Sequence, residues 1–245
     1  MSSRLRRRDN ISSQPNNKNT YNLFLIEELY ILCSIRKYQY KICDPLCVSL
    51  RVCLLAELAI MGYITMVDGV IVVIDKGLFC GDGEIDRIYN KVLSFFRKRD
   101  NVKSWIKYLN GESIKSYNGY HIKRLRKKIK DSLMVKNMLI SYESRKFSIK
   151  SKIVVKEEVV KRLLEKLMVY LDNYKNNEND RRSMVLAVCL YYVTGYYIIG
   201  NYDSRFGCKY VEIIKEICKK VDKEIIRDGE EGLIYQLLKT LINSN

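Results

Sequence analysis

The 245-residue chain is 47% hydrophobic, contains two prolines and twelve glycines, and carries a formal net charge of +16. This composition suffices for one substantial hydrophobic core, and it excludes collagen-like and low-complexity classes of protein. The positive excess predicts attraction to a polyanion, which is either nucleic acid or an anionic lipid surface.

The positive charge is concentrated in two segments. Residues 121–152 contain eleven lysines and arginines but two acidic residues, and residues 1–10 contain four arginines and one aspartate. The rest of the chain is close to balanced, so a general contribution to solubility does not explain the excess. Each segment is therefore a candidate contact for a polyanion.

Cysteine and histidine usage points away from metal and nucleophile chemistry. None of the eight cysteines forms a Cys-x-x-Cys pair, and His121 is the single histidine. We expect reduced, mostly buried thiols in a cytosolic protein, with no bound metal and no cofactor. His121 is expected near solvent at the start of a helix. The sequence also lacks a glycine-rich phosphate loop, so we expect the protein not to be an enzyme.

Residues 1–20 are rich in Ser, Asn and Arg and poor in residues that pack, so they are predicted to form a disordered arginine-rich tail. No apolar run follows the arginines, so a secretory signal is not expected. Residues 21–245 are predicted to form one mainly helical domain with short β-hairpins. Hairpins are expected at 63–75 and 138–155. Helices are expected at 21–35, 44–62, 84–98, 101–109, 120–136, 156–174, 181–200, 205–223 and 231–243.

Local signals indicate where three of these elements begin, end or turn. Asp44 followed by Pro45 is a favoured pair at the N-cap and first position of a helix. Gly62 is favoured just beyond a helix end. Asp68-Gly69 between β-branched runs is a strong signal for a hairpin turn.

The run at residues 183–202 contains no charged side chain and is long enough to cross a bilayer. Five tyrosines and two glycines within it argue against a membrane-spanning helix. The helices predicted on either side are amphipathic, as in a soluble fold. The run is therefore predicted to form a buried central helix.

The helix expected at 120–136 has two distinct faces. At 100° per residue, its apolar stripe consists of Ile122, Leu125, Ile129 and Leu133. The cations on the adjacent flank are Lys123, Arg126, Lys127 and Lys130, whereas Arg124 and Lys128 are expected to face solvent. A solvated face usually mixes both signs of charge, so the flank is predicted to meet a polyanion. A basic helix followed by a basic hairpin is also typical of a winged-helix-like nucleic-acid binder, which is the alternative prediction.

Four segments carry a family resemblance. They are "LRVCLLAELAIMGYI" (50–64), "VKSWIKYLNGES" (102–113), "IKRLRKKIKDSLMVKNML" (122–139) and "DRRSMVLAVCLYYVTG" (180–195). In that order they are similar to segments of the Golgi phosphoprotein 3 family. The resemblance covers residues 21–242, and it implies a mainly α-helical single domain with short β-hairpins and a basic, lipid-facing surface. It favours membership of this family over a nucleic-acid binder.

Members of the family are adaptors rather than catalysts, and the resemblance implies the same for this chain. They bind phosphatidylinositol 4-phosphate on the cytosolic face of the Golgi. They also link the cytosolic tails of glycosyltransferases to coatomer, so that these enzymes are retained and returned by retrograde vesicles. The implied partners are therefore a phosphatidylinositol 4-phosphate membrane, coatomer and glycosyltransferase tails, without nucleic acid. Because family members self-associate, a homo-oligomer is a further expectation.

The lipid pocket of the family suggests particular site residues in this chain. The phosphate-binding positions correspond to Arg51, Lys123 and Arg126. Lysine at the second of these positions offers a point charge where the family has the bidentate fork of arginine. The family's tryptophan corresponds to Ile42, and the candidate replacements for it are Tyr38 and Tyr40. This departure bears on lipid selectivity more than on membrane binding.

Two further contacts are implied by position. The family inserts residues of one hairpin into the membrane, and this hairpin matches residues 140–151, where Phe147 is the candidate. The coatomer-binding cluster corresponds to Arg6, Arg7 and Arg8. Read from its composition alone, such a tail equally fits a nuclear signal or a nucleic-acid arm.

Overall fold

The computed structural model describes residues 23–34, 44–74, 77–79, 81, 83–110, 119–143, 151–177, 179–195, 197–198 and 207–243. Several predicted site residues lie outside this part of the chain, namely Arg6, Arg7, Arg8, Tyr38, Tyr40, Ile42 and Phe147. The three predicted phosphate-binding residues, Arg51, Lys123 and Arg126, lie within it.

The described residues form a mainly helical fold with two antiparallel hairpins, as the sequence predicts. The strands are β1 (Ile64–Val67), β2 (Val70–Val73), β3 (Leu139–Glu143) and β4 (Ser151–Val155). The helices are α1 (Leu25–Cys33), α2 (Pro45–Ile60), α3 (Glu84–Phe95), α4 (Val102–Asn110), α5 (Leu125–Val135), α6 (Glu157–Asp172), α7 (Arg181–Thr194), α9 (Gly207–Lys223) and α10 (Glu230–Ile242).

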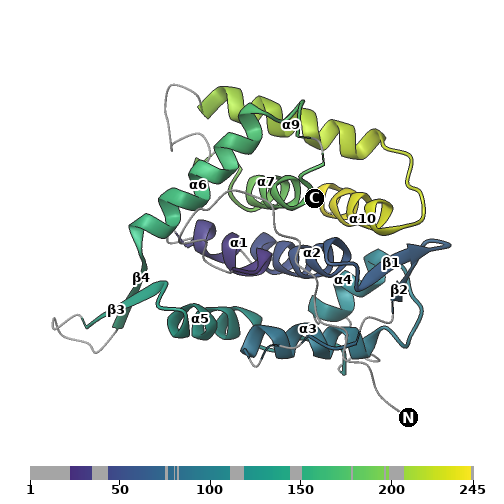
Figure 1. Cartoon of the computed structure of the whole chain (residues 1–245), viewed down its shortest axis with the longest axis horizontal. Coiled ribbons are helices and arrows are strands. Elements are labelled where there is room, and N and C mark those ends of the chain that lie inside the picture. The colour runs from purple at the N-terminus through teal and green to yellow at the C-terminus, as the bar shows by residue number, and fades with distance from the viewer. Residues whose placement is uncertain are drawn as a thin grey trace, which may run out of the picture.

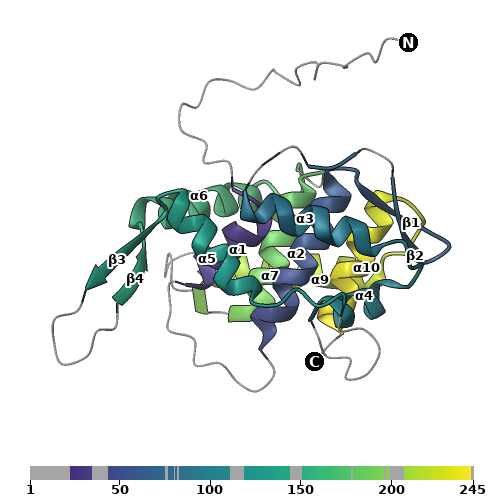
Figure 2. The same ribbon diagram turned by 90° about the horizontal axis from the view of Figure 1, so that it is seen from below.

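Helices α2 and α7 pack against each other in the middle of the molecule, with α1 and α10 beside them (Figure 1). Helices α6 and α9 cover one side of this central layer, and α3 and α5 cover the other. Hairpin β1–β2 lies at one end of the long axis, and hairpin β3–β4 projects from the opposite end, beyond α5 (Figure 2). The basic helix α5 therefore connects the middle of the molecule to the projecting hairpin.

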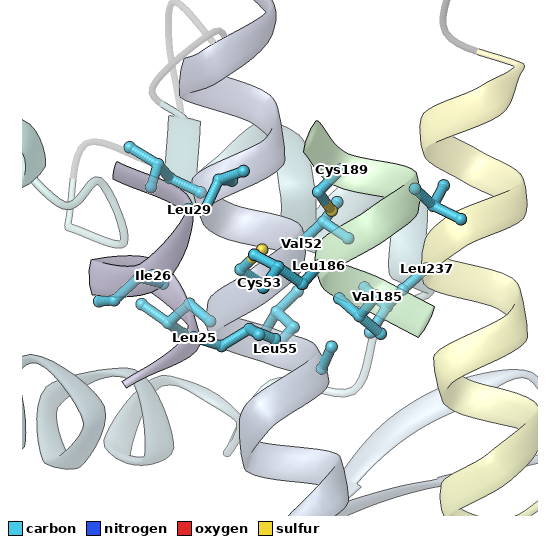
Figure 3. Close-up of a cluster of buried hydrophobic side chains, with 14 of the residues drawn as sticks. Leu25, Ile26, Leu29, Val52, Cys53, Leu55, Val185, Leu186, Cys189 and Leu237 are labelled. Carbon is cyan, nitrogen blue, oxygen red and sulfur yellow. The ribbon is translucent and has the colours of Figure 1, made fainter. Parts of the chain in front are cut away.

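The hydrophobic core joins the four central helices (Figure 3). Its members include Leu25 and Ile26 of α1, Cys53 of α2, Leu186 of α7 and Leu237 of α10, all at most 2% exposed. Helix α7 is buried along residues 183–190, which confirms the central position predicted for this part of the charge-free run. The predicted end of the helix at residue 200 is wrong, because α7 ends at Thr194, before Gly195 with its positive φ. Within the described residues, no helix has the length and apolar character that crossing a bilayer requires.

The boundaries of helix α2 and the turn after β1 follow the predicted signals. Asp44 caps α2 by accepting a hydrogen bond from Leu46 N at 3.1 Å. Gly62 has φ of 69° and donates its N–H to Ala59 O at 2.8 Å, as a Schellman-type helix end requires. Asp68 and Gly69 both have positive φ between the paired residues of β1 and β2, which is the conformation of a type I′ hairpin turn.

A buried ionic cluster fastens the central helices to one another. Glu57 of α2 accepts hydrogen bonds from Leu25 N and from the Tyr89 hydroxyl, each at 2.7 Å, and it pairs with Arg182 of α7. Arg182 also lies 3.4 Å from Glu28 of α1. Burial raises the pKa of Glu57, although Arg182 and Tyr89 act in the opposite direction. The cluster therefore depends on a nearby cation to hold a carboxylate inside the protein.

The six cysteines that the structure describes are free thiols. Cys33, Cys53 and Cys189 are buried, whereas Cys208 is exposed. No group of three or more His, Cys, Asp or Glu side chains in the described part of the chain is placed to hold a metal ion.

Candidate anion-binding site

The basic helix begins later than the sequence indicates. Arg124 adopts a left-handed conformation with φ of 55°, and α5 begins only at Leu125. The prediction of a continuous helix from residue 120 is therefore wrong, and Lys123 precedes the helix. The apolar stripe is nevertheless correct, because Ile122, Leu125, Ile129 and Leu133 are all buried. No glycine marks the left-handed position, so the sequence offered no signal for it.

Arg51 is held inside the protein by main-chain carbonyls. It lies in the second turn of α2 and is 4% exposed. Its Nε donates to Leu109 O, at the end of α4, at 3.3 Å, and its Nη1 donates to Cys47 O at 2.8 Å. These bonds fix the guanidinium between the first turn of α2 and the end of α4.

Arg126 approaches the same turn of α2 from helix α5. Its Nη2 donates to Cys47 Sγ at 3.1 Å and forms an ion pair with the carboxylate of Asp44. Cys47 is thus contacted by both arginines, through its carbonyl oxygen and its thiol. Two residues that are 75 positions apart in the chain therefore converge on the N-terminal turn of one helix.

Lys123 reaches this region through the segment that precedes α5. Ile122 N donates to Leu109 O at 3.3 Å, and that carbonyl also accepts the bond from Arg51. Burial lowers the pKa of His121, and the charges of Arg51, Lys123 and Lys91 lower it further. Arg51 and Lys123 are thus both close enough to act on one imidazole. Arg51 and Arg126 converge on Cys47, and the segment that carries Lys123 lies beside Arg51. We call these three residues the α2 anion site (Arg51, Lys123 and Arg126).

The chemistry of the α2 anion site suits a compact polyanion. Two guanidiniums and an exposed ammonium group offer several N–H donors, and the N-terminus of α2 adds the positive end of a helix dipole. Phosphate groups are bound in this way because charge-assisted bonds to arginine are short and strong. Asp44 opposes such binding, since its carboxylate already occupies Arg126.

Asp44 is the component of the site that the sequence analysis missed. The Asp-Pro pair identified it as a helix cap, which the structure confirms. Its second role depends on α5 folding back against α2, and no local pattern carries that information. The position of Asp44 seven residues before Arg51 was the available hint, because both flank the first turns of the same helix.

The remaining cations of α5 divide into exposed and paired groups. Arg124 is exposed, as predicted. Lys128 was expected to face solvent, but its ammonium lies 2.5 Å from Glu84 of α3, because α3 packs alongside α5. Lys136 just beyond the helix lies 2.6 Å from the buried carboxylate of Glu27. Part of the basic helix therefore serves to dock it onto its neighbours.

An exposed apolar group lies at the base of the projecting hairpin. Val135 is 88% exposed at the end of α5, and Met134 and Val154 are also exposed. The sequence analysis did not single them out. The available signal was that Val135 lies two residues, or about 200°, from Leu133 of the buried stripe, so its side chain has to point away from the core.

The sequence model of the Golgi phosphoprotein 3 (GPP34) family matches residues 25–196, which is more than half of the chain. The match includes Arg51, Lys123 and Arg126 together with α1 to α7. It gives the nucleic-acid alternative no support. No curated protein matches the chain.

Proposed function

We propose that this chain is a peripheral Golgi membrane adaptor that recognises phosphatidylinositol 4-phosphate. The chain belongs to the Golgi phosphoprotein 3 family, and this membership is the starting point of the proposal. The observation that carries this proposal is the convergence of Arg51 and Arg126 on Cys47, with Lys123 beside them. In this proposal the 4-phosphate occupies the α2 anion site. Arg51 is already held in place, whereas Arg126 exchanges its contact with Asp44 for one with the phosphate.

The energetics favour a phosphomonoester over a diester. A phosphomonoester carries a charge of about −1.5 to −2 at neutral pH and presents three acceptor oxygens. A hydrogen bond to a charged group contributes roughly 1.5–3 kcal/mol when it is well formed. Two such bonds therefore supply about 3 kcal/mol or more, which is roughly a hundredfold in affinity. A general anionic surface adds about 1 kcal/mol for each nearby lysine or arginine, so salt is expected to weaken the second contribution more than the first.

The test is flotation with phosphatidylcholine vesicles that contain phosphatidylinositol 4-phosphate. Binding is expected for the natural chain and is expected to be lost in Lys123→Ala/Arg126→Ala. The matched control is Lys215→Ala/Lys219→Ala, which removes two exposed cations from α9 on the opposite side of the molecule. The comparison uses vesicles in which phosphatidylserine supplies the same total charge. Equal binding to these vesicles would reduce the proposal to nonspecific electrostatic attraction.

The hairpin is proposed to insert into the membrane beside the lipid head group. Phe147, which lies outside the described residues, is the candidate, and the exposed Val135 and Val154 near the base of the hairpin support this orientation. The α2 anion site lies at the start of α5, and hairpin β3–β4 follows the end of α5. Helix α5 therefore connects the proposed charged contact to the proposed apolar contact. One face of the molecule thereby offers a charged contact and an apolar contact to the same bilayer.

The adaptor role further requires protein partners. Arg6, Arg7 and Arg8 are proposed to bind coatomer, while the helical domain binds cytosolic tails of glycosyltransferases on the cytosolic face of the Golgi. Such an adaptor retains these enzymes and returns them by retrograde transport without catalysing a reaction. We expect the chain to capture purified coatomer and to lose this capture when the three arginines are replaced by alanine. Unchanged capture would remove the cluster from the proposal.

A further inference from the structure

His121 is fixed beside the α2 anion site by residues on both sides of it. Tyr120 packs against Phe95 of α3 and Trp105 of α4, with ring centroids 5.2 Å and 5.5 Å apart. Ile122 donates its N–H to Leu109 O, the same carbonyl that accepts from Arg51. The contacts of Tyr120 and Ile122 therefore place the half-buried His121 where the segment that leads into α5 passes α3, α4 and Arg51 of α2.

The charges that lower the pKa of His121 are those of three cations. Helix α2 contributes Arg51, α3 contributes Lys91, and the neighbouring segment contributes Lys123. Helix α4 contributes the Leu109 carbonyl, which is already occupied by two donors. Lys91 also lies over the ring of Phe95, 5.7 Å from its centroid, and this ring supports Tyr120.

Lys91 and Lys123 differ from several other cations of the basic surface in their pairing. Arg126, Lys128 and Lys136 each pair with a carboxylate. In the part of the chain that the structure describes, no carboxylate lies within ion-pair distance of Lys91, Lys123 or His121. Lys91 and Lys123 therefore add positive charge beside a titratable ring, and that charge favours an anion bound next to the ring.

We propose that His121 is a ligand of the phosphate group in its protonated form, so that the α2 anion site takes up one proton from solvent as it binds a phosphomonoester. Lys91 supplies a further cation to the same group. This inference rests on the proposed function and deepens it, because it adds a residue that distinguishes a doubly charged phosphate from a singly charged phosphodiester. Neither His121 nor Lys91 belongs to the group that the family resemblance implies.

The sign of the pH dependence follows from the charges. In the empty site, burial and the three cations hold the pKa of His121 below its usual 6.5, so the ring is neutral near pH 7. A dianion beside the ring offsets much of this positive charge and favours the imidazolium. Proton uptake on binding means that affinity falls as pH rises, by up to about tenfold per pH unit, while the bound imidazole remains protonated. The phosphate stays mostly dianionic above its second pKa of about 6.

Because the chain contains a single histidine, nuclear magnetic resonance reports the imidazole directly. Its titration is to be followed in the full chain with and without inorganic phosphate, with potassium chloride matching the ionic strength. We expect a pKa below 6.5 that rises when phosphate is added, and a smaller rise in Lys91→Gln. Lys215→Gln on α9 removes an equal charge elsewhere and is expected to leave the rise unchanged. No rise in the natural chain would overturn the inference.

The second arm uses vesicles with phosphatidylinositol 4-phosphate between about pH 6.5 and pH 8.0, where we expect affinity to fall at least about threefold. His121→Gln retains a hydrogen-bonding side chain but does not titrate, so its affinity is expected to be flat over this range. A pH-independent natural chain that still binds the lipid sinks the inference and leaves the proposed function intact. Absence of lipid binding at every pH sinks the proposed function. A phosphate-induced shift without lipid binding upholds His121 as a ligand and assigns the site to a soluble phosphate.

Discussion

Asp44→Asn is expected to tighten phosphate binding, because it removes the negative charge that pairs with Arg126 at the α2 anion site. The substitution removes the ion pair with Arg126 and leaves an amide oxygen that still caps α2, since Asn and Asp are equally good N-caps. Arg126 then meets the ligand without first leaving a carboxylate, and the ligand no longer faces a like charge.

The size of the effect follows from Coulomb's law. If the phosphate that replaces Asp44 on Arg126 is taken to lie about 6 Å from the carboxylate, two unit charges at that distance interact by about 0.7 kcal/mol in water and about 2.8 kcal/mol at an effective dielectric constant of 20. The side chains of Arg126 and Asp44 are partly exposed to solvent, so we use the smaller interaction energy, which applies in water. For a dianion it doubles to about 1.4 kcal/mol, which is about tenfold in affinity.

The assay is a titration of the natural chain and the variant with vesicles that contain phosphatidylinositol 4-phosphate. Glu216→Gln on α9 is the matched control, because it removes one exposed acid far from the site. Asp44→Ala serves as a second variant that loses the cap as well, with an expected cost of about 1 kcal/mol in unfolding free energy. Equal or weaker lipid binding by Asp44→Asn, in a variant that melts normally, would place the phosphate away from Arg126 and refute the site.

Two other predictions concern stability and membrane contact. Arg182→Gln leaves Glu57 buried without its cation and is expected to lower the free energy of unfolding by about 3–5 kcal/mol in urea titrations. Burial raises the pKa of Glu57, so the variant should regain stability as pH falls and the folded state takes up a proton; equal loss at every pH would contradict this. Val135→Ser is expected to weaken vesicle binding about threefold to tenfold without changing the melting temperature, whereas Ile225→Ser, at a similarly exposed position outside the proposed membrane face, should bind normally. Equal effects of the two serines would remove Val135 from the membrane contact.

Local signals in the sequence predicted most of the fold. Three of these features depend on the conformation of one or two residues, so the residue types at those positions identify them. They are the Asp44 cap, Gly62 beyond the end of a helix and the Asp68-Gly69 turn. The central helix at residues 183–194 was recognisable because a long charge-free run has to be buried. These features need no knowledge of the rest of the chain.

Interactions between distant elements explain what the sequence did not reveal. The pairing of Asp44 with Arg126, the contact of Lys128 with Glu84 and the position of His121 beside Arg51 all require α5 to pack in one orientation against α2 and α3. A helical projection treats the cations of a helix as equivalent, and it fails where the helix itself begins late. Because Arg124 is left-handed, Lys123 lies before the helix and not within it. The hydrogen bond from Ile122 N to Leu109 O nevertheless keeps this segment beside Arg51.

The pairing of these cations determines how a ligand is recognised. A basic helix whose lysines and arginines were all unpaired would attract any anionic surface, with little discrimination. In this chain Lys128 and Lys136 are engaged by Glu84 and Glu27, and Arg126 is held by Asp44. A ligand gains Arg126 only by displacing Asp44, and the double charge of a phosphomonoester is attracted to Arg51, Lys123 and Arg126 about twice as strongly as the single charge of a diester. Asp44 therefore lowers affinity for both classes of lipid, and Asp44→Asn should raise affinity about threefold for a singly charged lipid and about tenfold for a doubly charged phosphomonoester.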